Sequence, residues 1–170
     1  MEEIEVLKSI ALDEYLTDDK YCQVEDLLAV CVVNLSASLN GILQAIFTVR
    51  GTGKNPNIKE LGADLQNIIQ HIAVLTHCLD LAVPEYEEIE QFVYEDISDE
   101  NKMDVTTCIL SVQHIYANLV LEYYAGAFDP ENEDMVNADM MQVGILDMLA
   151  NIMCVCTRYK LDFTEVITLG

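Results

Sequence analysis

The sequence predicts an all-α protein: a helical bundle of two related helical hairpins with short flanking helices. Long stretches almost free of charge alternate with acidic segments, which is typical of helices that bury one face. Helix-start signals recur along the chain, and no β alternation or hairpin dipeptide lies between them. The chain is also 52% hydrophobic despite a net charge of −22, so it can form an apolar core.

Start and stop signals divide the chain into helices. Thr17 with Asp18 and Asp19 marks a start, because oxygen acceptors and acids stabilise the exposed amide groups of a first turn. The segment RGTGKNPN, residues 50–57, indicates a loop, while Pro84 and Pro130, each followed by an acid, suit first turns. The predicted helices are 3–16, 18–49, 58–80, 84–95, 98–126, 130–158 and 162–168.

A chain of 170 residues favours one helical domain, 1–170. The order of predicted helices is long, long, short, and it occurs twice, which indicates an internal repeat over 18–95 and 98–168. A Leu-Asp-apolar step after each second long helix, at 79–81 and 161–163, favours the same division. Two hairpins would then pack about a pseudo-twofold axis as a four-helix core.

Composition favours a reduced, cytoplasmic setting. The first residues, MEEIE, lack the basic and apolar parts of a signal peptide, and the six cysteines form no CxxC pair. Leu27 to Val49 is uncharged and long enough to span a bilayer. Small or polar residues form a stripe along this segment: Asn34, Ser38, Gly41 and Ala45. Such a stripe favours packing against another helix, so we expect no membrane span.

Residues 140–167 carry a family resemblance. They read MMQVGILDMLANIMCVCTRYKLDFTEVI, with Asp147 in a long apolar helix that ends before Leu161-Asp162-Phe163-Thr164-Glu165-Val166. This pattern resembles the third helix and exit of the all-α nucleoside triphosphate pyrophosphohydrolases, the MazG and dimeric dUTPase group. In the first half, Glu60-Leu-Gly-Ala-Asp64 leading to Leu79-Asp80-Leu81 is similar to the family's Glu-x-x-Asp step with one extra residue.

The resemblance implies a nucleotide cleft with Mg²⁺ held by carboxylates, since a hard cation takes oxygen ligands and neutralises phosphate charge. The family draws those ligands from an E-x-x-E and an E-x-x-D step. This chain departs from both: Gly144 stands where the partner of Asp147 would be, and residues 34–41 contain no carboxylate. The metal ligands implied by pooling both halves are Glu60, Asp64, Glu122 and Asp147. The alternative is that these are four ordinary solvated or hydrogen-bonded acids.

These observations predict a MazG-like protein that has lost catalysis and acts by binding a nucleotide or a protein. An active Mg²⁺-dependent nucleoside triphosphate pyrophosphohydrolase is one alternative. Another is an acidic mimic of nucleic acid that inhibits a basic DNA- or RNA-binding protein and does not itself bind nucleic acid. Its partner-binding ridge would comprise Glu85, Glu87, Glu88, Glu90, Glu95, Asp96, Asp99 and Glu100. The high apolar content also favours a homodimer.

Overall fold

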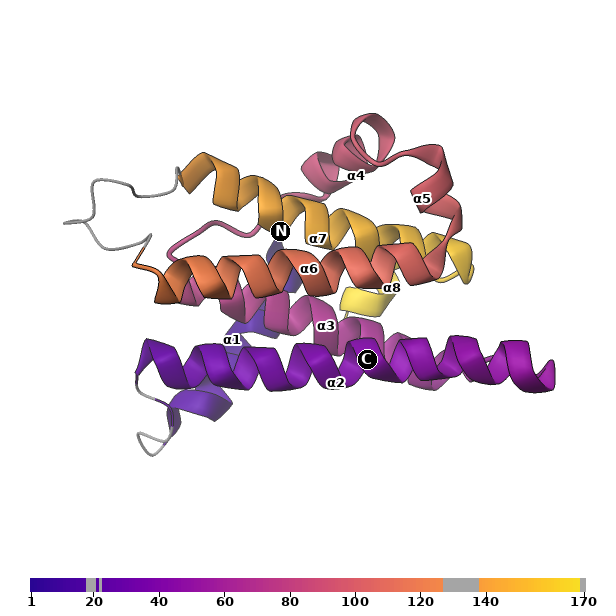
Figure 1. Cartoon of the computed structure of the whole chain (residues 1–170). Coiled ribbons are helices and arrows are strands. Elements are labelled where there is room, and N and C mark those ends of the chain that lie inside the picture. Colours follow the sequence, from indigo (N-terminus) through magenta and orange to yellow (C-terminus); the bar gives the residue numbers. More distant parts are fainter. Residues whose placement is uncertain (18–20, 22, 127–137, 169–170) are drawn as a thin grey trace.

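The computed structural model describes residues 1–17, 21, 23–126 and 138–168, which form eight α-helices and no strand (Figure 1). The all-α prediction is confirmed. The helices are α1 (Glu2–Leu16), α2 (Val24–Thr52), α3 (Ile58–Cys78), α4 (Tyr86–Glu95), α5 (Asp99–Met103), α6 (Val105–Tyr124), α7 (Ala138–Arg158) and α8 (Phe163–Ile167).

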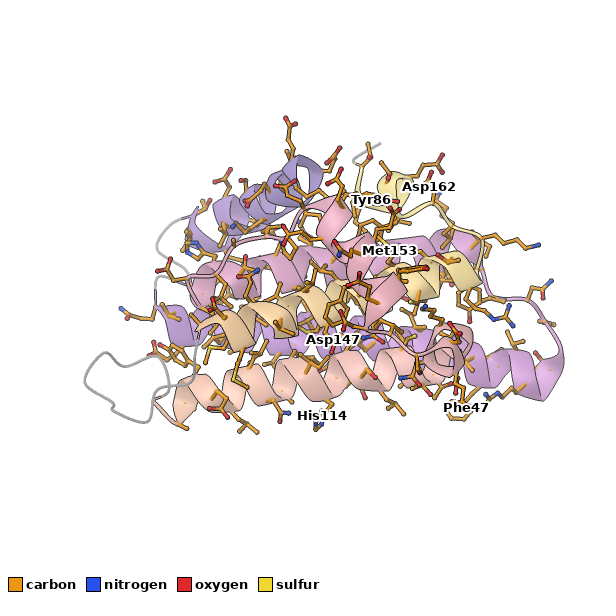
Figure 2. The ribbon with its side chains drawn as sticks, turned by 90° about the horizontal axis from the view of Figure 1, so that it is seen from above. Phe47, Tyr86, His114, Asp147, Met153 and Asp162 are labelled. Atoms are coloured by element: carbon orange, nitrogen blue, oxygen red, sulfur yellow. The ribbon has the colours of Figure 1, made fainter. Side chains whose placement is uncertain are left out.

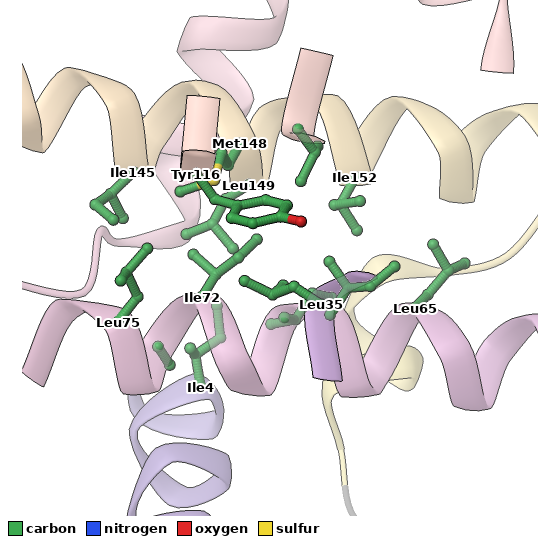
Figure 3. Packing of buried hydrophobic residues seen from close by; sticks show 14 of the residues in the cluster. Ile4, Leu35, Leu65, Ile72, Leu75, Tyr116, Ile145, Met148, Leu149 and Ile152 are labelled. Atoms are coloured by element: carbon green, nitrogen blue, oxygen red, sulfur yellow. The ribbon is translucent and has the colours of Figure 1, made fainter. Parts of the chain in front are cut away.

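Four long helices form the centre of the bundle. Helices α2 and α3 pack as one hairpin and α6 and α7 as a second, with α2 beside α6 and α3 beside α7. Each helix turns an apolar face inward, and Figure 3 shows Leu35, Ile72, Tyr116 and Leu149, one from each long helix, close together in the core. Burial of these faces supplies the main stabilisation of the fold.

Two of the four short helices pack across the two halves of the chain, and the other two pack on their own half. Helix α4, which follows the first hairpin, contacts α7, while α8, which follows the second hairpin, contacts α3. Likewise α1 precedes the first hairpin and contacts α3, and α5 precedes the second and contacts α7. An internal repeat over 18–95 and 98–168 stays a prediction. A repeat would produce matching contacts of this kind in the two halves.

Helices α3 and α7 end in the same way. Asp80 and Lys160, two residues after the respective helices, have positive φ angles of 55° and 58°. The next amides, of Leu81 and Leu161, each donate to a carbonyl five residues earlier at 2.8 Å, which is the Schellman pattern. The predicted match of 79–81 with 161–163 is therefore wrong by two residues. Asp162 instead begins α8, where its side chain accepts from Thr164 N at 2.9 Å.

Aligning Asp80 with Lys160 also aligns the burial of the two helices. Residues 61–77 of α3 and 141–157 of α7 follow the same order of buried, half-buried and exposed side chains, with one exception at Gln70 and Ala150. The two helices therefore present matching faces to their surroundings. This correspondence, at an offset of 80 residues, gives a register for comparing the two halves.

Several predicted boundaries are corrected by the structure. The helix expected over 98–126 is two helices, because Asp104 is extended (φ −115°, ψ 102°) and its carboxylate caps α6 by accepting from Thr106 N. Helix α2 begins at Val24 and continues to Thr52, where Gly53 (φ 71°) ends it through a hydrogen bond to the Val49 carbonyl oxygen. The expected starts at 18–20 and 130–137 lie outside the described residues.

Two described helices, α2 and α7, are long and apolar enough to cross a membrane. In the most apolar window of α7, 61% of the residues are buried inside the bundle, against 39% for α2. Core helices of globular bundles have the same length and composition, so these features alone do not indicate a membrane protein. The lower burial of α2 reflects its position at the edge of the bundle (Figure 1).

Candidate functional site

The four predicted metal ligands do not converge. Glu60 and Asp64 are one turn apart on α3, while Glu122 is exposed on α6 and Asp147 is half-buried on α7. Within the described residues, no three His, Cys, Asp or Glu side chains are arranged to hold a metal ion. Because Mg²⁺ needs several oxygen ligands around one point, these four carboxylates do not fit it as a set.

Asp64 faces α2 at a point where the two helices come close. The Ser38 hydroxyl lies near the Asp64 carboxylate, and Asn67 Nδ2 donates to Ser38 Oγ at 2.7 Å. A Cβ added to Gly41 would lie 2.8 Å from Asp64 Oδ2, so any larger residue there requires the Asp64 carboxylate to move. Burial, and then the charge of Glu60, raise the pKa of Asp64, while the nearby Ser38 hydroxyl opposes the shift. Asp64 therefore has a structural role at the α2–α3 contact.

Asp147 is held within α7 and borders a polar cavity. Asn151 Nδ2 donates to Asp147 Oδ1 at 2.7 Å and to the Asp147 carbonyl oxygen at 2.8 Å. Burial, with a smaller contribution from Asp96, raises the pKa of the Asp147 carboxyl. The cavity, of about 460 Å³, lies between α5, α6 and α7 and includes His114 (Figure 2). One of the predicted metal ligands, Asp147, therefore borders a cavity.

The register of the two halves changes which residues correspond. Asn67 lies thirteen residues before Asp80, and Asp147 lies thirteen before Lys160. In this register the step Gly144-x-x-Asp147 is matched with Asp64-x-x-Asn67. The similarity of Glu60-x-x-x-Asp64 to the family's Glu-x-x-Asp step stays a prediction. Each step has one carboxylate, Asp64 at the first position in the first half and Asp147 at the last position in the second. Neither step therefore has two acids one turn apart.

In the first half, His71 occupies the position that corresponds to Asn151, since it lies nine residues before Asp80. The Tyr15 hydroxyl of α1 lies 2.6 Å from His71 Nε2. Because the Asn67 carbonyl oxygen can only accept, His71 Nδ1 carries the proton in their 2.8 Å hydrogen bond, and Nε2 accepts from Tyr15. The two halves therefore differ here in their partners: His71 is hydrogen-bonded to Tyr15 of α1, whereas Asn151 is hydrogen-bonded to Asp147 within α7.

A larger cavity, of about 610 Å³, lies elsewhere, at one end of the bundle. It is formed by the end of α2, the connection to α3, the start of α6 and the end of α7. Three cationic side chains line it, Arg50, Arg158 and Lys160, beside the ring of Tyr159. The whole chain has only eight Lys and Arg residues against thirty Asp and Glu, so this concentration of positive charge is far above the average of the sequence.

The three cations are available to a ligand. None of them forms an ion pair with a carboxylate in the part of the chain that the structure describes. The carboxylate in the lining, Asp104, is engaged by α6: it accepts from Thr107 Oγ1 at 2.8 Å and from Thr106 N at 3.1 Å. These bonds, and then the charge of Arg50, hold its pKa below the usual value. We name this site, lined by Arg50, Asp104, Arg158, Tyr159 and Lys160, the basic cavity.

Sequence reasoning missed the basic cavity, although a signal was present. Five of the eight basic residues lie in two stretches, 50–59 and 158–160, each at the end of a long helix. The RGTGK segment was interpreted only as a turn, and in fact Arg50, Gly51 and Thr52 complete α2. The antiparallel packing of the hairpins brings the two stretches to the same end.

The predicted acidic ridge lies on α4 and α5, and all eight of its side chains are exposed. Among the described residues, two of the eight form ion pairs: Glu85 with the Met1 amine at 3.2 Å and Asp99 with Lys102 at 3.3 Å. Most of the ridge charge is therefore compensated by solvent and counterions.

Comparisons with known proteins give no match: no protein-family model, no curated protein and no solved structure is similar to this chain at a significant level. The functional proposals therefore rest on the geometry and charge of the sites above.

Proposed function

We propose that this protein is a MazG-like helical bundle that binds a nucleotide or a similar phosphorylated small molecule in the basic cavity without hydrolysing it. The observation that carries the proposal is the convergence of Arg50, Arg158 and Lys160 around one cavity in a chain with a net charge of −22. Elsewhere the surface repels anions, so an anionic ligand is directed to this place.

The chemistry of the lining suits a phosphorylated ligand. Arginine guanidinium groups donate paired hydrogen bonds to phosphate oxygens, and lysine adds a compact positive charge. The volume of about 610 Å³ lies in the range of small-molecule sites. Tyr159, half-buried beside the cations, offers an apolar ring against which a base can stack.

Binding without turnover is favoured by the positions of the carboxylates. The four candidate metal ligands are dispersed, and Asp147 is hydrogen-bonded to Asn151. Hydrolysis between phosphates requires several carboxylates on one metal ion, close to the reacting phosphorus. We therefore derive no metal-dependent step, and the alternative of an active pyrophosphohydrolase is the less favoured proposal.

The test is isothermal titration of the purified protein with nucleoside triphosphates and with inorganic tripolyphosphate, each in Mg²⁺ and in EDTA. We expect binding that persists in EDTA and weakens as salt is raised, because the contacts are between unlike charges. Arg50→Ala combined with Arg158→Ala should weaken it by about 100- to 10,000-fold, since each charge-assisted hydrogen bond contributes about 1.5–3 kcal/mol and two are lost.

The matched control is Lys102→Ala, which removes one positive charge from a residue already paired with Asp99. Its affinity should equal that of the unmodified protein. Absence of binding for every triphosphate, or equal binding by the double arginine variant, contradicts the proposal. Release of pyrophosphate in Mg²⁺ would instead support the enzymatic alternative.

A second candidate function, capture of a basic protein, is favoured by the full exposure of the α4–α5 ridge. Its test is binding of poly-L-lysine to the unmodified protein and to a variant carrying Glu87→Gln, Glu88→Gln and Glu90→Gln. Affinity that falls steeply with salt, and falls again in the variant, supports the ridge. Affinity that does not change with salt opposes it.

A further inference from the structure

The cavity beside Asp147 is opposite in charge to the basic cavity. It lies between α5, α6 and α7, and its volume of about 460 Å³ is within the range of small-molecule sites. None of the described residues that line it is Lys or Arg, and two are carboxylates, Asp147 and Asp96. We name it the acidic cavity. Such a lining repels anions, so its ligand is neutral or positively charged.

The Asp147 carboxylate has an oxygen available to a ligand. Its Oδ1 atom accepts from Asn151 Nδ2 at 2.7 Å, and in the described part of the chain no donor bonds to Oδ2. Asp147 is half-buried, and no described cation forms an ion pair with it. Lys102, on the adjacent α5, is paired with Asp99 at 3.3 Å. Because a carboxylate withdrawn from water is stabilised by a positive partner, a bound cation supplies the partner that Asp147 lacks.

The basic side chain in the lining, His114, does not supply that charge. Asn118 Nδ2, which can only donate, lies 3.1 Å from His114 Nε2. In this arrangement Nε2 accepts and the imidazole is neutral. The charged groups of the lining are therefore the two carboxylates. Asp96 is close enough for its charge to raise the pKa of Asp147, so the cavity has two neighbouring sites for positive charge.

Part of the lining is apolar. Three aliphatic side chains contribute to it: Ile97, Leu110 and Ile115. Leu110 is 50% exposed, although the chain buries most of its other leucines. Methylene groups of a ligand gain stability by covering such a surface. The acidic cavity thus combines two carboxylates with an aliphatic wall.

We propose that the acidic cavity binds an aliphatic diamine or a longer polyamine, with one ammonium group on Asp147 and the second toward Asp96. The methylene chain between them lies against the aliphatic wall. A monoamine leaves one carboxylate without a partner. A divalent metal ion is a poorer occupant, because no three His, Cys, Asp or Glu side chains of the described residues are arranged to hold one.

The test is isothermal titration of the full chain with diaminobutane, n-butylamine and butanediol at one ionic strength. We expect saturable binding of one diaminobutane per chain. The monoamine should bind about 10-fold or more weakly, since it makes one charge-assisted contact in place of two. The uncharged diol should not bind. Absence of diaminobutane binding, or equal affinities for the amine and the diamine, contradicts the proposal.

Two variants locate the site. Asp147→Asn removes the charge, keeps the shape and should weaken binding by about 10- to 100-fold. Ser111→Leu changes no charge but fills the cavity from a half-buried position in its lining, and should also prevent binding. The matched control is Glu165→Gln, which removes an exposed carboxylate from α8 and should bind normally. Circular dichroism checks that each variant is folded.

The controls also separate this site from general attraction to an acidic protein. Equal weakening in Glu165→Gln and Asp147→Asn would show that the net charge of −22, and not the cavity, holds the diamine. Full affinity in Ser111→Leu would place the diamine outside the cavity. Complete displacement by millimolar Mg²⁺ at matched ionic strength would make a metal ion the occupant. Each of these results overturns the proposal.

Discussion

Asp80 and Lys160 occupy the same backbone position in the two halves of the protein. Each is the left-handed residue that ends the second long helix of its half, with φ of 55° and 58°. The amide that follows each residue returns to the helix with a 2.8 Å hydrogen bond, so the backbone keeps this conformation although neither residue is glycine. The left-handed region costs a side chain about 1–2 kcal/mol, less for Asp than for Lys.

Replacing Lys160 with glycine should therefore stabilise the protein. Relief of the left-handed strain exceeds the entropy that glycine adds to the unfolded chain, for a net gain of about 0.5–1 kcal/mol. Thermal unfolding should show a melting temperature higher by about 1–4 °C. Asp80→Gly is the matched comparison and should gain less. A lower melting temperature for Lys160→Gly would show that its side chain makes stabilising contacts.

Gly41 and Gly144 should respond oppositely to alanine. A Cβ at Gly41 meets Asp64 Oδ2 at 2.8 Å, so Gly41→Ala forces the Asp64 carboxylate to rotate away, and the net cost should be small, about 0.5 kcal/mol. At Gly144 the nearest atoms, of Ile115 and Leu119, are 3.5–3.6 Å away, and Gly144→Ala should gain about 0.5–1 kcal/mol of helix propensity. Urea unfolding measures both.

The cause of the Gly41 effect can be isolated with a double variant. Removing the carboxylate by Asp64→Ala takes away the atoms that the new Cβ would meet. In that background Gly41→Ala should no longer destabilise the protein. A cost that persists would place the obstruction in the backbone of α3 rather than in the Asp64 side chain.

Asp147→Asn should stabilise the protein at neutral pH. Burial raises the pKa of Asp147 in the folded state, so its contribution to stability is complete in acid and is lost as pH rises through that raised pKa. Asparagine removes this loss and can still accept the hydrogen bond from Asn151. The melting temperature of the variant should exceed that of the unmodified protein at pH 7, and the difference should vanish below about pH 4.

A control separates this effect from a general loss of negative charge. Glu87→Gln removes one carboxylate from an exposed position on α4. Its gain at pH 7 should be smaller than that of Asp147→Asn. Equal gains would show that overall repulsion, and not burial of Asp147, is responsible.

Tyr15→Phe should destabilise the contact between α1 and α3. The variant leaves His71 Nε2, in a side chain that is only 2% exposed, without its hydrogen-bond donor, at a cost of about 1–3 kcal/mol. Denaturant unfolding at pH 7.5 measures the loss, and Tyr94→Phe, at an exposed position, should show none.

The same contact has a pH dependence. Burial lowers the pKa of His71, so its contribution to stability is present above about pH 6.5 and is lost as pH falls below that value. Repeating the unfolding of the unmodified protein at pH 5.5 should show this loss. The His71→Gln variant has no imidazole to titrate, so the change in its unfolding free energy from pH 7.5 to pH 5.5 should be more favourable than that of the unmodified protein. Equal changes in the two proteins would contradict the assignment.

Local chemistry accounts for the parts of the fold that could be predicted. Asn57, Ser98, Asp104 and Asp162 accept hydrogen bonds from the first amides of α3, α5, α6 and α8, and such caps act within a few residues of the chain. Apolar periodicity likewise depends on near neighbours. The all-α class and most helix positions could therefore be predicted. Splitting of 98–126 was missed because Ser98 with Asp99 and Glu100 already forms a helix start, and a second start at Asp104 follows it after only one turn.

Tertiary packing determined the sites. Periodicity leaves the rotation and longitudinal register of each helix loosely specified, so the separation of Glu122 from Asp147 and the correspondence of Asp64 with Gly144 could not be deduced. Arg50 and Arg158 are more than a hundred residues apart, and they share a cavity only because α2 and α7 end at the same side of the bundle. Residue chemistry thus specified helices and charge, whereas long-range packing decided which side chains meet.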